Sequence, residues 1–165
     1  MCSTYEGDTP ENQAKRHRES LSLLCVAIDR LRSIQDLMGR AEVDCIVQDV
    51  GQTVSSLIRK SDIVARLDDD RIVAVLPRAP RGGALHVANN ICRAVARERP
   101  AGSVSPGITV SIGVATFPSC AANVYSLFDA ADEALSWAQK QGRDRAVLAP
   151  TQPMPAQLQT TACTT

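Results

Sequence analysis

The sequence contains few of the residues that dominate nucleic-acid and zinc sites. Only 3% of its residues are aromatic, so it offers few rings on which single-stranded nucleic acid can stack. It has two histidines, His17 and His86, and no Cys-x-x-Cys pair, which argues against zinc. Lysine plus arginine equals aspartate plus glutamate, with 18 of each, so no net charge attracts nucleic acid or an anionic membrane. We therefore expect no nucleic-acid partner and no metal.

Long apolar runs and targeting signals are also missing. The longest apolar run, LLCVAI, is far too short to span a bilayer. The first twenty residues are polar throughout and do not resemble a signal peptide. The six cysteines are scattered, and Cys25, Cys45 and Cys92 stand among aliphatic residues, where a thiol acts as a small hydrophobe. We expect a reduced, cytoplasmic protein without a membrane segment.

The composition divides the chain into one domain and two polar ends. A chain of 165 residues with 44% hydrophobic residues suits a single domain with a real core. Residues 1–20 are polar and predict an N-terminal arm or a lead-in helix. Residues 150–165 are rich in Thr, Gln and Pro and predict a disordered C-terminal tail. The folded unit should span residues 21–149.

The hydrophobic periodicity inside this unit alternates between the strand and the helix type. Two apolar runs, DIVARL and RIVAVLP, flank three aspartates and predict a hairpin. Asn123 is placed to cap a helix. The expected strands cover 21–28, 62–67, 71–77, 107–117 and 145–149, and the expected helices cover 41–58, 82–97 and 124–141. This order predicts an α+β domain with a ferredoxin-like split βαβ core and a mostly antiparallel sheet flanked by helices.

Four segments of the chain carry a family resemblance. They are LLCVAIDRLRSIQDLMG, KSDIVARLDDDRIVAVLP, ITVSIGVATFP and LFDAADEALSWAQKQGRDRAV. With them, residues 21–149 resemble the GGDEF domain, the catalytic module of diguanylate cyclases, which join two GTP molecules into cyclic di-GMP. The segment DDDRI (68–72) stands where the family has its Gly-Gly-Asp/Glu-Glu-Phe signature.

The resemblance implies that the catalytic turn is degenerate. Asp68 and Asp69 replace the two glycines whose bare backbone approaches the nucleotide. Asp70 keeps the acidic third position, as a remnant of the catalytic group, whereas Arg71 inverts the charge of the fourth. Ala27 stands where the first strand of the family carries a magnesium-binding aspartate. We expect the three aspartates, without a metal to compensate them, to repel one another and stay in water.

The remaining family positions imply damaged nucleotide contacts as well. Gln35 replaces an asparagine that contacts guanine, while Asp44, the partner contact, remains. Gln139 replaces a phosphate-binding lysine, and only Arg143 is left of that pair. Asp29 is expected to cap the helix that follows it. These losses predict weak or absent magnesium binding, no cofactor and an inactive cyclase domain.

One sequence motif of the family is complete in this chain. Many cyclases carry Arg-x-x-Asp shortly before the signature turn, where it binds cyclic di-GMP as product inhibition, and Arg59 and Asp62 stand at that register. An arginine fork can hold a phosphate or a guanine edge. Arg66 and Arg93 are candidates for a further phosphate contact, Arg93 because it lies one helical turn from Asn90, where the family has a second arginine.

Each of these sites also has a plainer interpretation. The acidic triplet suits a solvated hairpin tip, and Arg59 and Asp62 suit a surface pair of little energy. Asp44 and Arg143 suit ordinary polar positions. Three functions therefore remain open. The first is a receptor or regulatory module that binds cyclic di-GMP in bacterial second-messenger signalling. The second is an interaction module that binds no nucleotide, as a homodimer or with a partner signalling protein. The third is a residual diguanylate cyclase.

Overall fold

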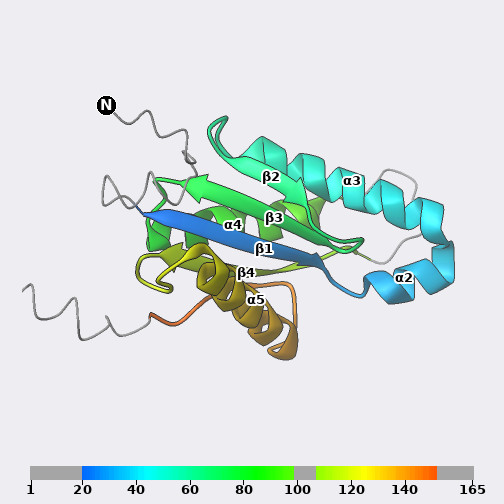
Figure 1. Cartoon of the computed structure of the whole chain (residues 1–165). Helices are drawn as coiled ribbons and strands as arrows, with labels where there is room; N and C mark the ends of the chain where they lie inside the picture. Colours follow the sequence, from blue (N-terminus) through cyan, green and yellow to red (C-terminus); the bar gives the residue numbers. More distant parts are fainter. Residues whose placement is uncertain (1–19, 99–106, 152–165) are drawn as a thin grey trace, which may run out of the picture.

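A five-stranded sheet with helices on both faces organises the chain (Figure 1). The structure is a computed structural model, and it describes residues 20–98 and 107–151. The predicted arm and most of the predicted tail lie outside these residues. The strand order is β2-β3-β1-β4-β5, and all neighbouring strands are antiparallel except β4 and β5. The strands are β1 (Leu21–Ile28), β2 (Ile63–Arg66), β3 (Arg71–Pro77), β4 (Val110–Phe117) and β5 (Ala146–Leu148). The predicted α+β fold is confirmed.

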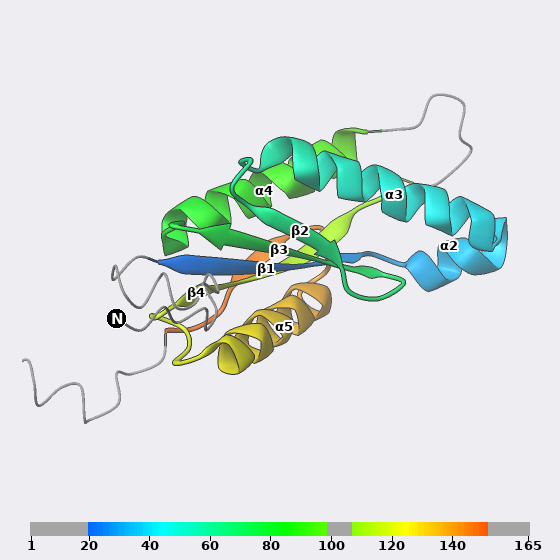
Figure 2. The same ribbon diagram turned by 45° about the horizontal axis from the view of Figure 1, so that its top comes forward.

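Four helices form two layers around this sheet. They are α2 (Leu31–Met38), α3 (Arg40–Leu57), α4 (Arg81–Arg97) and α5 (Val124–Lys140). Figure 2 shows α3 and α4 on one face of the sheet and α5 alone on the other. Each layer encloses its own apolar cluster, because residues of α3 and α4 belong to one buried cluster and residues of α5 to the second.

The central strand β1 explains why both faces must be covered. All eight of its residues are buried, as expected for a nearly continuous apolar run. Successive side chains of a strand point to opposite faces, so Leu24 and Val26 join the cluster beneath α3 and α4, while Cys25 and Ala27 join the cluster beneath α5. Strand β1 therefore places position 27 on the α5 face of the sheet.

Gly113 lets α5 rest directly on β4. A Cβ atom at this position would lie 2.0 Å from the carbonyl oxygen of Ala131 and 2.4 Å from the backbone nitrogen of Leu135. Only a residue without a side chain permits this approach of helix and strand. The glycine of the SIGVA segment is therefore a packing requirement of the fold.

The order of elements predicted from periodicity leaves out α2. This helix has eight residues and buries only Leu31 and Ile34. Two apolar residues are too few to show helical periodicity in the sequence. Gly39, with φ of 89°, separates α2 from α3. The predicted cap of α5 is confirmed, since the Asn123 side chain accepts a hydrogen bond from the backbone N–H of Ser126. Within residues 20–98 and 107–151, no helix has the length and apolarity needed to cross a bilayer.

Candidate functional site

The acidic triplet lies at the tip of the β2–β3 hairpin. The backbone N–H of Leu67 donates to the carbonyl of Arg71 over 2.9 Å and closes the loop. Asp68, Asp69 and Asp70 are all exposed, and the Asp69 side chain is 91% accessible. Among the residues that the structure describes, no three His, Cys, Asp or Glu side chains gather closely enough to hold a metal ion.

Two arginines lie close to the acidic tip of the hairpin. Nε and Nη2 of Arg66 donate to the backbone carbonyls of Asp68 and Asp69, both over 3.2 Å. The Arg66 guanidinium also lies 3.7 Å from the Asp44 carboxylate and 3.9 Å from that of Asp69. Nε of Arg71 lies 3.6 Å from the Asp68 carboxylate. The three aspartates are exposed, as expected, and Asp68 and Asp69 each lie within 4 Å of an arginine side chain.

Ala27, to which the resemblance assigns the place of a magnesium ligand, is buried and lies next to a cation. Ala27 is 3% exposed and is paired in register with Arg71 on the neighbouring strand. The Arg71 side chain lies on the α5 side, where Nη1 donates to the Asp132 carboxylate over 2.7 Å. A magnesium ion bound with phosphates needs carboxylate oxygens at such a place. Because an alanine and a guanidinium stand there instead, these residues do not fit the ion.

Asp29 does not form the helix cap that the sequence predicts, and its carboxylate is hydrogen-bonded elsewhere. The first residue before α2 is Arg30, with φ of 57° and no side-chain cap, so Asp29 does not cap the helix. Its buried carboxylate instead accepts hydrogen bonds from the Ser111 hydroxyl (2.6 Å), the Thr109 hydroxyl (2.8 Å) and the backbone N–H of Asp144 (3.0 Å). The three donors come from β4, the segment before it and the loop after α5. Asp29 therefore joins these three pieces of chain.

A groove runs between α2 and the hairpin. It has a volume of about 680 Å³ and brings Gln35 of α2 together with the acidic triplet of the hairpin. Asp44 does not line this groove but lies beside it, in a neighbouring hollow, where it forms an ion pair with Arg66. The complete lining is Leu31, Arg32, Gln35, Val43, Arg66, Leu67, Asp68, Asp69 and Asp70. The groove thus brings together Gln35, one of the two positions assigned to guanine, and the acidic triplet.

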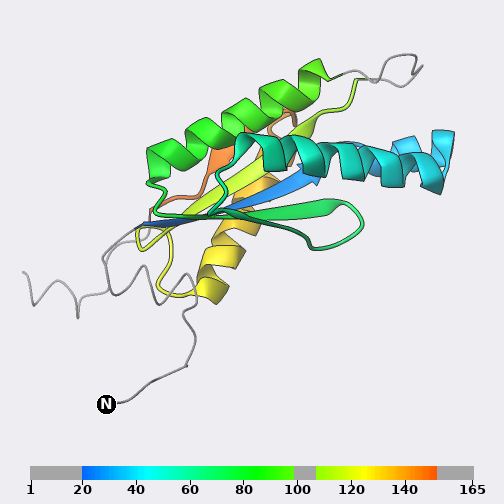
Figure 3. The ribbon, with the colours of Figure 1, turned by 90° about the horizontal axis from the view of Figure 1, so that it is seen from above.

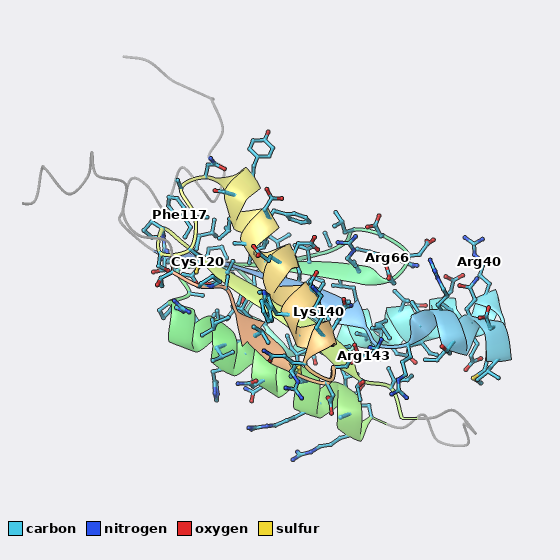
Figure 4. The ribbon with its side chains drawn as sticks, turned by 90° about the horizontal axis from the view of Figure 1, so that it is seen from below. Arg40, Arg66, Phe117, Cys120, Lys140 and Arg143 are labelled. Carbon is cyan, nitrogen blue, oxygen red and sulfur yellow. The ribbon has the colours of Figure 1, made fainter. Side chains whose placement is uncertain are left out.

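The positions assigned to phosphate lie apart from that groove. Arg143 lines a second hollow, of about 790 Å³, together with Arg32 and Asp29. Its backbone is left-handed, with φ of 65°, and its N–H donates to the carbonyl of Ala138 over 3.0 Å. Gln139 is exposed near the end of α5 and does not line either hollow. Figure 4 shows Lys140 and Arg143 at that end of the helix.

Arg59 and Asp62 form a closed turn between α3 and β2. The Asp62 carboxylate accepts from the backbone N–H of Arg59 over 2.8 Å, and the N–H of Asp62 donates to the Arg59 carbonyl over 3.0 Å. Within the described parts of the chain, no hydrogen bond or ion pair occupies the Arg59 guanidinium. Arg93 is exposed on α4, and Arg66 is held at the hairpin by its hydrogen bonds to Asp68 and Asp69.

Burial changes two ionisable groups near these sites. The pKa of the Cys25 thiol is raised to about 12, first by burial and then by the negative charge of Asp132. This thiol therefore stays protonated and unreactive beneath the Arg71–Asp132 pair. The pKa of Asp144 is also raised, first by partial desolvation of its carboxyl group and then by the negative charge of Asp29, although the residue as a whole is exposed.

Sequence reasoning missed the residues that hold these sites in place. Asp132, Thr109 and Ser111 carry no family role in the sequence interpretation, yet each binds a site residue directly. The sequence did hold a hint of Asp132. An arginine at position 71, on the side of the sheet that a helix covers, needs an acidic partner nearby because a covered charge is costly when unpaired. No such signal marked Thr109 and Ser111.

The chain is similar in sequence to proteins of known activity. A family profile described as "Diguanylate cyclase, GGDEF domain" matches residues 8–145. The chain is 35% identical over 135 residues to the diguanylate cyclase TpbB of Pseudomonas aeruginosa, covering 79% of this chain and 30% of that protein. It is 36% identical over 131 residues to the diguanylate cyclase DgcM of Escherichia coli, covering 79% of this chain and 31% of that protein. The chain thus spans about a third of the length of these relatives.

Two solved structures share the fold. The GGDEF domain of TpbB superposes with a TM-score of 0.81 at 30% identity, covering 87% of this chain and 90% of that one. The GGDEF domain of DgcB from Caulobacter crescentus, in complex with c-di-GMP, gives a TM-score of 0.78 at 20% identity, covering 85% of this chain and 84% of that one. The second likeness supports the fold alone.

Proposed function

The chain belongs to the GGDEF domain family, and from this premise we propose that it is a catalytically inactive member that serves as a cyclic di-GMP-binding regulatory module. The domain binds the dinucleotide at the Arg59–Asp62 turn. It does not make the dinucleotide in the groove beside the hairpin.

The residues in and beside the groove next to the hairpin support the proposal that the domain is not a cyclase. Phosphoryl transfer in such enzymes depends on metal ions that neutralise the developing charge. Here Ala27 supplies no ligand, and Arg71 is held by Asp132. Asp68 and Asp69 add two negative charges where glycines would let a nucleotide approach. At about 4 Å and an effective dielectric near 20, one such contact with a phosphate opposes binding by roughly 4 kcal/mol.

The observation that carries the binding proposal is the exposed guanidinium of Arg59 beside a closed turn. The two hydrogen bonds between Arg59 and Asp62 fix the turn before any ligand arrives. A fixed backbone lowers the ordering cost of binding. The outer fork of the arginine is suited to a phosphate or to the Hoogsteen edge of guanine. Each end of a cyclic guanine dinucleotide offers both groups.

The same geometry limits the expected affinity. Part of the hydrogen-bonding capacity of Asp62 is used by the Arg59 N–H. Asn90 on α4 brings no positive charge to the position where the family has its second arginine. A ligand held mainly by one arginine fork should bind in the micromolar range, at about −8 kcal/mol.

Calorimetry with cyclic di-GMP tests the proposal. The wild-type chain should give a micromolar isotherm that Arg59→Ala weakens strongly or removes. Arg40→Ala is the matched control, because Arg40 begins α3 at the opposite end of that helix. Arg81 would be a poor control, because its guanidinium donates to the Ala149 carbonyl over 2.9 Å. If the wild type gives no heat and no thermal shift at high ligand excess, the receptor function is wrong.

A second candidate is an interaction module that binds no nucleotide. The observation in its favour is that α5 carries two large exposed side chains, since Tyr125 is 85% exposed and Trp137 is 54% exposed. Light scattering of the purified chain, alone and with cyclic di-GMP, separates the candidates. A dimer that persists without ligand and is lost in Trp137→Ser would favour this second function.

A further inference from the structure

Strand β2 forms an open edge of the sheet. Among the residues that the structure describes, β2 pairs with β3 on one side and with no strand on the other. Figure 3 shows α3 alongside the β2–β3 hairpin on one face of the sheet and α5 on the other face. Most of β2 is exposed, and its first residue, Ile63, is 51% exposed. Proteins usually protect such an edge, because it can pair with another chain.

The hydrogen bonds of the hairpin show which backbone groups of β2 face outward. The N–H of Leu67 donates to the carbonyl of Arg71 over 2.9 Å, so the backbone of Leu67 faces β3. In an antiparallel pair this direction alternates from one residue to the next. The backbone groups of Ala65 therefore also face β3, whereas those of Val64 and Arg66 face away from the sheet. An incoming strand must pair with these two residues.

The charges at the two ends of β2 are opposite in sign. Lys60 precedes the strand and Asp68 follows it, and both are exposed. An antiparallel second copy with Val64 opposite its own counterpart places Asp62 opposite Arg66. Continued beyond the strand, the same register places Lys60 opposite Asp68. Opposite charges directly across two strands are favourable, and two-fold symmetry repeats each pair. The segment is therefore complementary in charge to an antiparallel copy of itself.

The charge pattern also selects this register over its neighbour. The outward backbone groups would equally permit a register with Val64 opposite Arg66. That register, however, places Asp62 opposite Asp68 at both ends of the paired strands. Like charges directly opposite each other are destabilising. The register with Val64 on the two-fold axis is therefore favoured.

A hollow beside the same edge leaves room for a second copy. It has a volume of about 600 Å³ and lies between α3 and β2. Val64 and Arg66 line it from the strand, and the small residues Gly51 and Ser55 line it from the helix. Val64 is partly buried and packs against the core cluster beneath α3 and α4. Residues directly opposite across two strands lie on the same face, so the two Val64 side chains would meet beside this hollow.

We infer that two copies of this chain associate through their β2 strands, antiparallel about a two-fold axis at Val64, so that their sheets become continuous. Ile63 of each copy then lies opposite Ala65 of the other, a large residue beside a small one. The interface is short and belongs to the weak, transient class. The inference does not rest on the proposed binding of cyclic di-GMP.

Sedimentation equilibrium of the full chain without ligand, at low salt and up to about 1 mM, tests the inference. The wild type should dimerise, and added salt should weaken the dimer because exposed charges are screened. Lys60→Glu and Asp68→Lys should each weaken self-association by about tenfold or more, since each brings like charges together twice in the dimer. An equimolar mixture of the two variants should dimerise again, because both pairs of charges are then opposite in sign.

Three further variants locate the interface. Val64→Pro removes an outward N–H and keeps the hydrogen bonds between β2 and β3, so it should abolish the dimer while thermal melting shows a folded chain. Glu133→Lys, a charge reversal at an exposed residue of α5, is the matched control and should dimerise like the wild type. Trp137→Ser should also keep the dimer, which separates the β2 interface from the surface of α5.

Four results would overturn the inference. They are a wild type that stays monomeric at every concentration, a mixture of the two charge variants that stays monomeric, a dimer that survives Val64→Pro, and a dimer that Trp137→Ser removes. The mixture decides the question even where Val64→Pro does not fold. None of these results bears on the calorimetry with cyclic di-GMP, so the two proposals fail separately.

Discussion

The guanidinium of Arg71 on β3 donates a hydrogen bond of 2.7 Å to the carboxylate of Asp132 on α5. This pair joins the strand next to β1 with the helix that covers β1. It lies on the face of the sheet that carries Ala27 and Cys25. The pair therefore fixes the position of α5 against the β1–β3 side of the sheet.

The Arg71–Asp132 pair should contribute measurable but modest stability. Both side chains are partly exposed, at 36% and 44%, so a coupling of about 1 kcal/mol is expected. A double-mutant cycle of Arg71→Ala and Asp132→Ala, followed by urea denaturation, measures it. The coupling should decrease as salt is raised. A coupling of zero at low salt would show that the pair does not hold α5 to the sheet.

The domain should make no cyclic di-GMP from GTP with Mg²⁺ or Mn²⁺. The reason is the combination of Ala27, the two extra charges on the hairpin and the cation at Arg71. Ala27→Asp alone should not restore activity, because the hairpin and Gln139 remain unchanged. Chromatography of an overnight reaction checks both proteins, with the relative DgcM as a positive control. Product above a no-enzyme blank would contradict the proposal of inactivity.

Gly113→Ala should be among the most damaging single substitutions in the chain. Its methyl group would lie 2.0 Å from a backbone oxygen of α5, and backbone cannot move aside as a side chain can. We expect a loss of about 3 kcal/mol or more in the free energy of unfolding. Gly82→Ala is the control, since nothing lies within 4 Å of its added methyl group. That change in α4 should stabilise by up to about 1 kcal/mol.

Asp144→Asn should stabilise the protein at neutral pH. Because burial and Asp29 raise the pKa of Asp144, the folded state holds this proton more tightly than the unfolded state. The ionised form opposes folding once the pH rises through the folded pKa, and protonation removes that cost at lower pH. Urea denaturation at pH 7 and pH 4 should therefore show a gain that shrinks at pH 4. Asp129→Asn, at an exposed position of α5, is the control. An equal gain at both values would exclude the electrostatic explanation.

The fold could be predicted from the sequence because its long elements are strongly periodic. The apolar run of β1 and the spaced valines of α3 are visible without any structure, and Asn123 marks the start of α5 correctly. Helix α2 was missed because two buried residues make no pattern. Asp29 was misassigned because an aspartate before a helix usually caps it, whereas its actual donors lie on β4 and in distant loops. The partners of Arg66 and Arg71 could not be predicted either, because they depend on which helices lie next to the hairpin.

The place of β1 in the sheet also sets the order in which the chain can fold as it is made. Leu21 pairs with Pro77 on one side and with Phe117 on the other, so the first strand is flanked by strands synthesised much later. Such long separations between paired residues slow folding. On the ribosome, the apolar strand LSLLCVAI must wait until β4 has emerged before both of its edges are covered. During that time its unpaired edge is open to other chains.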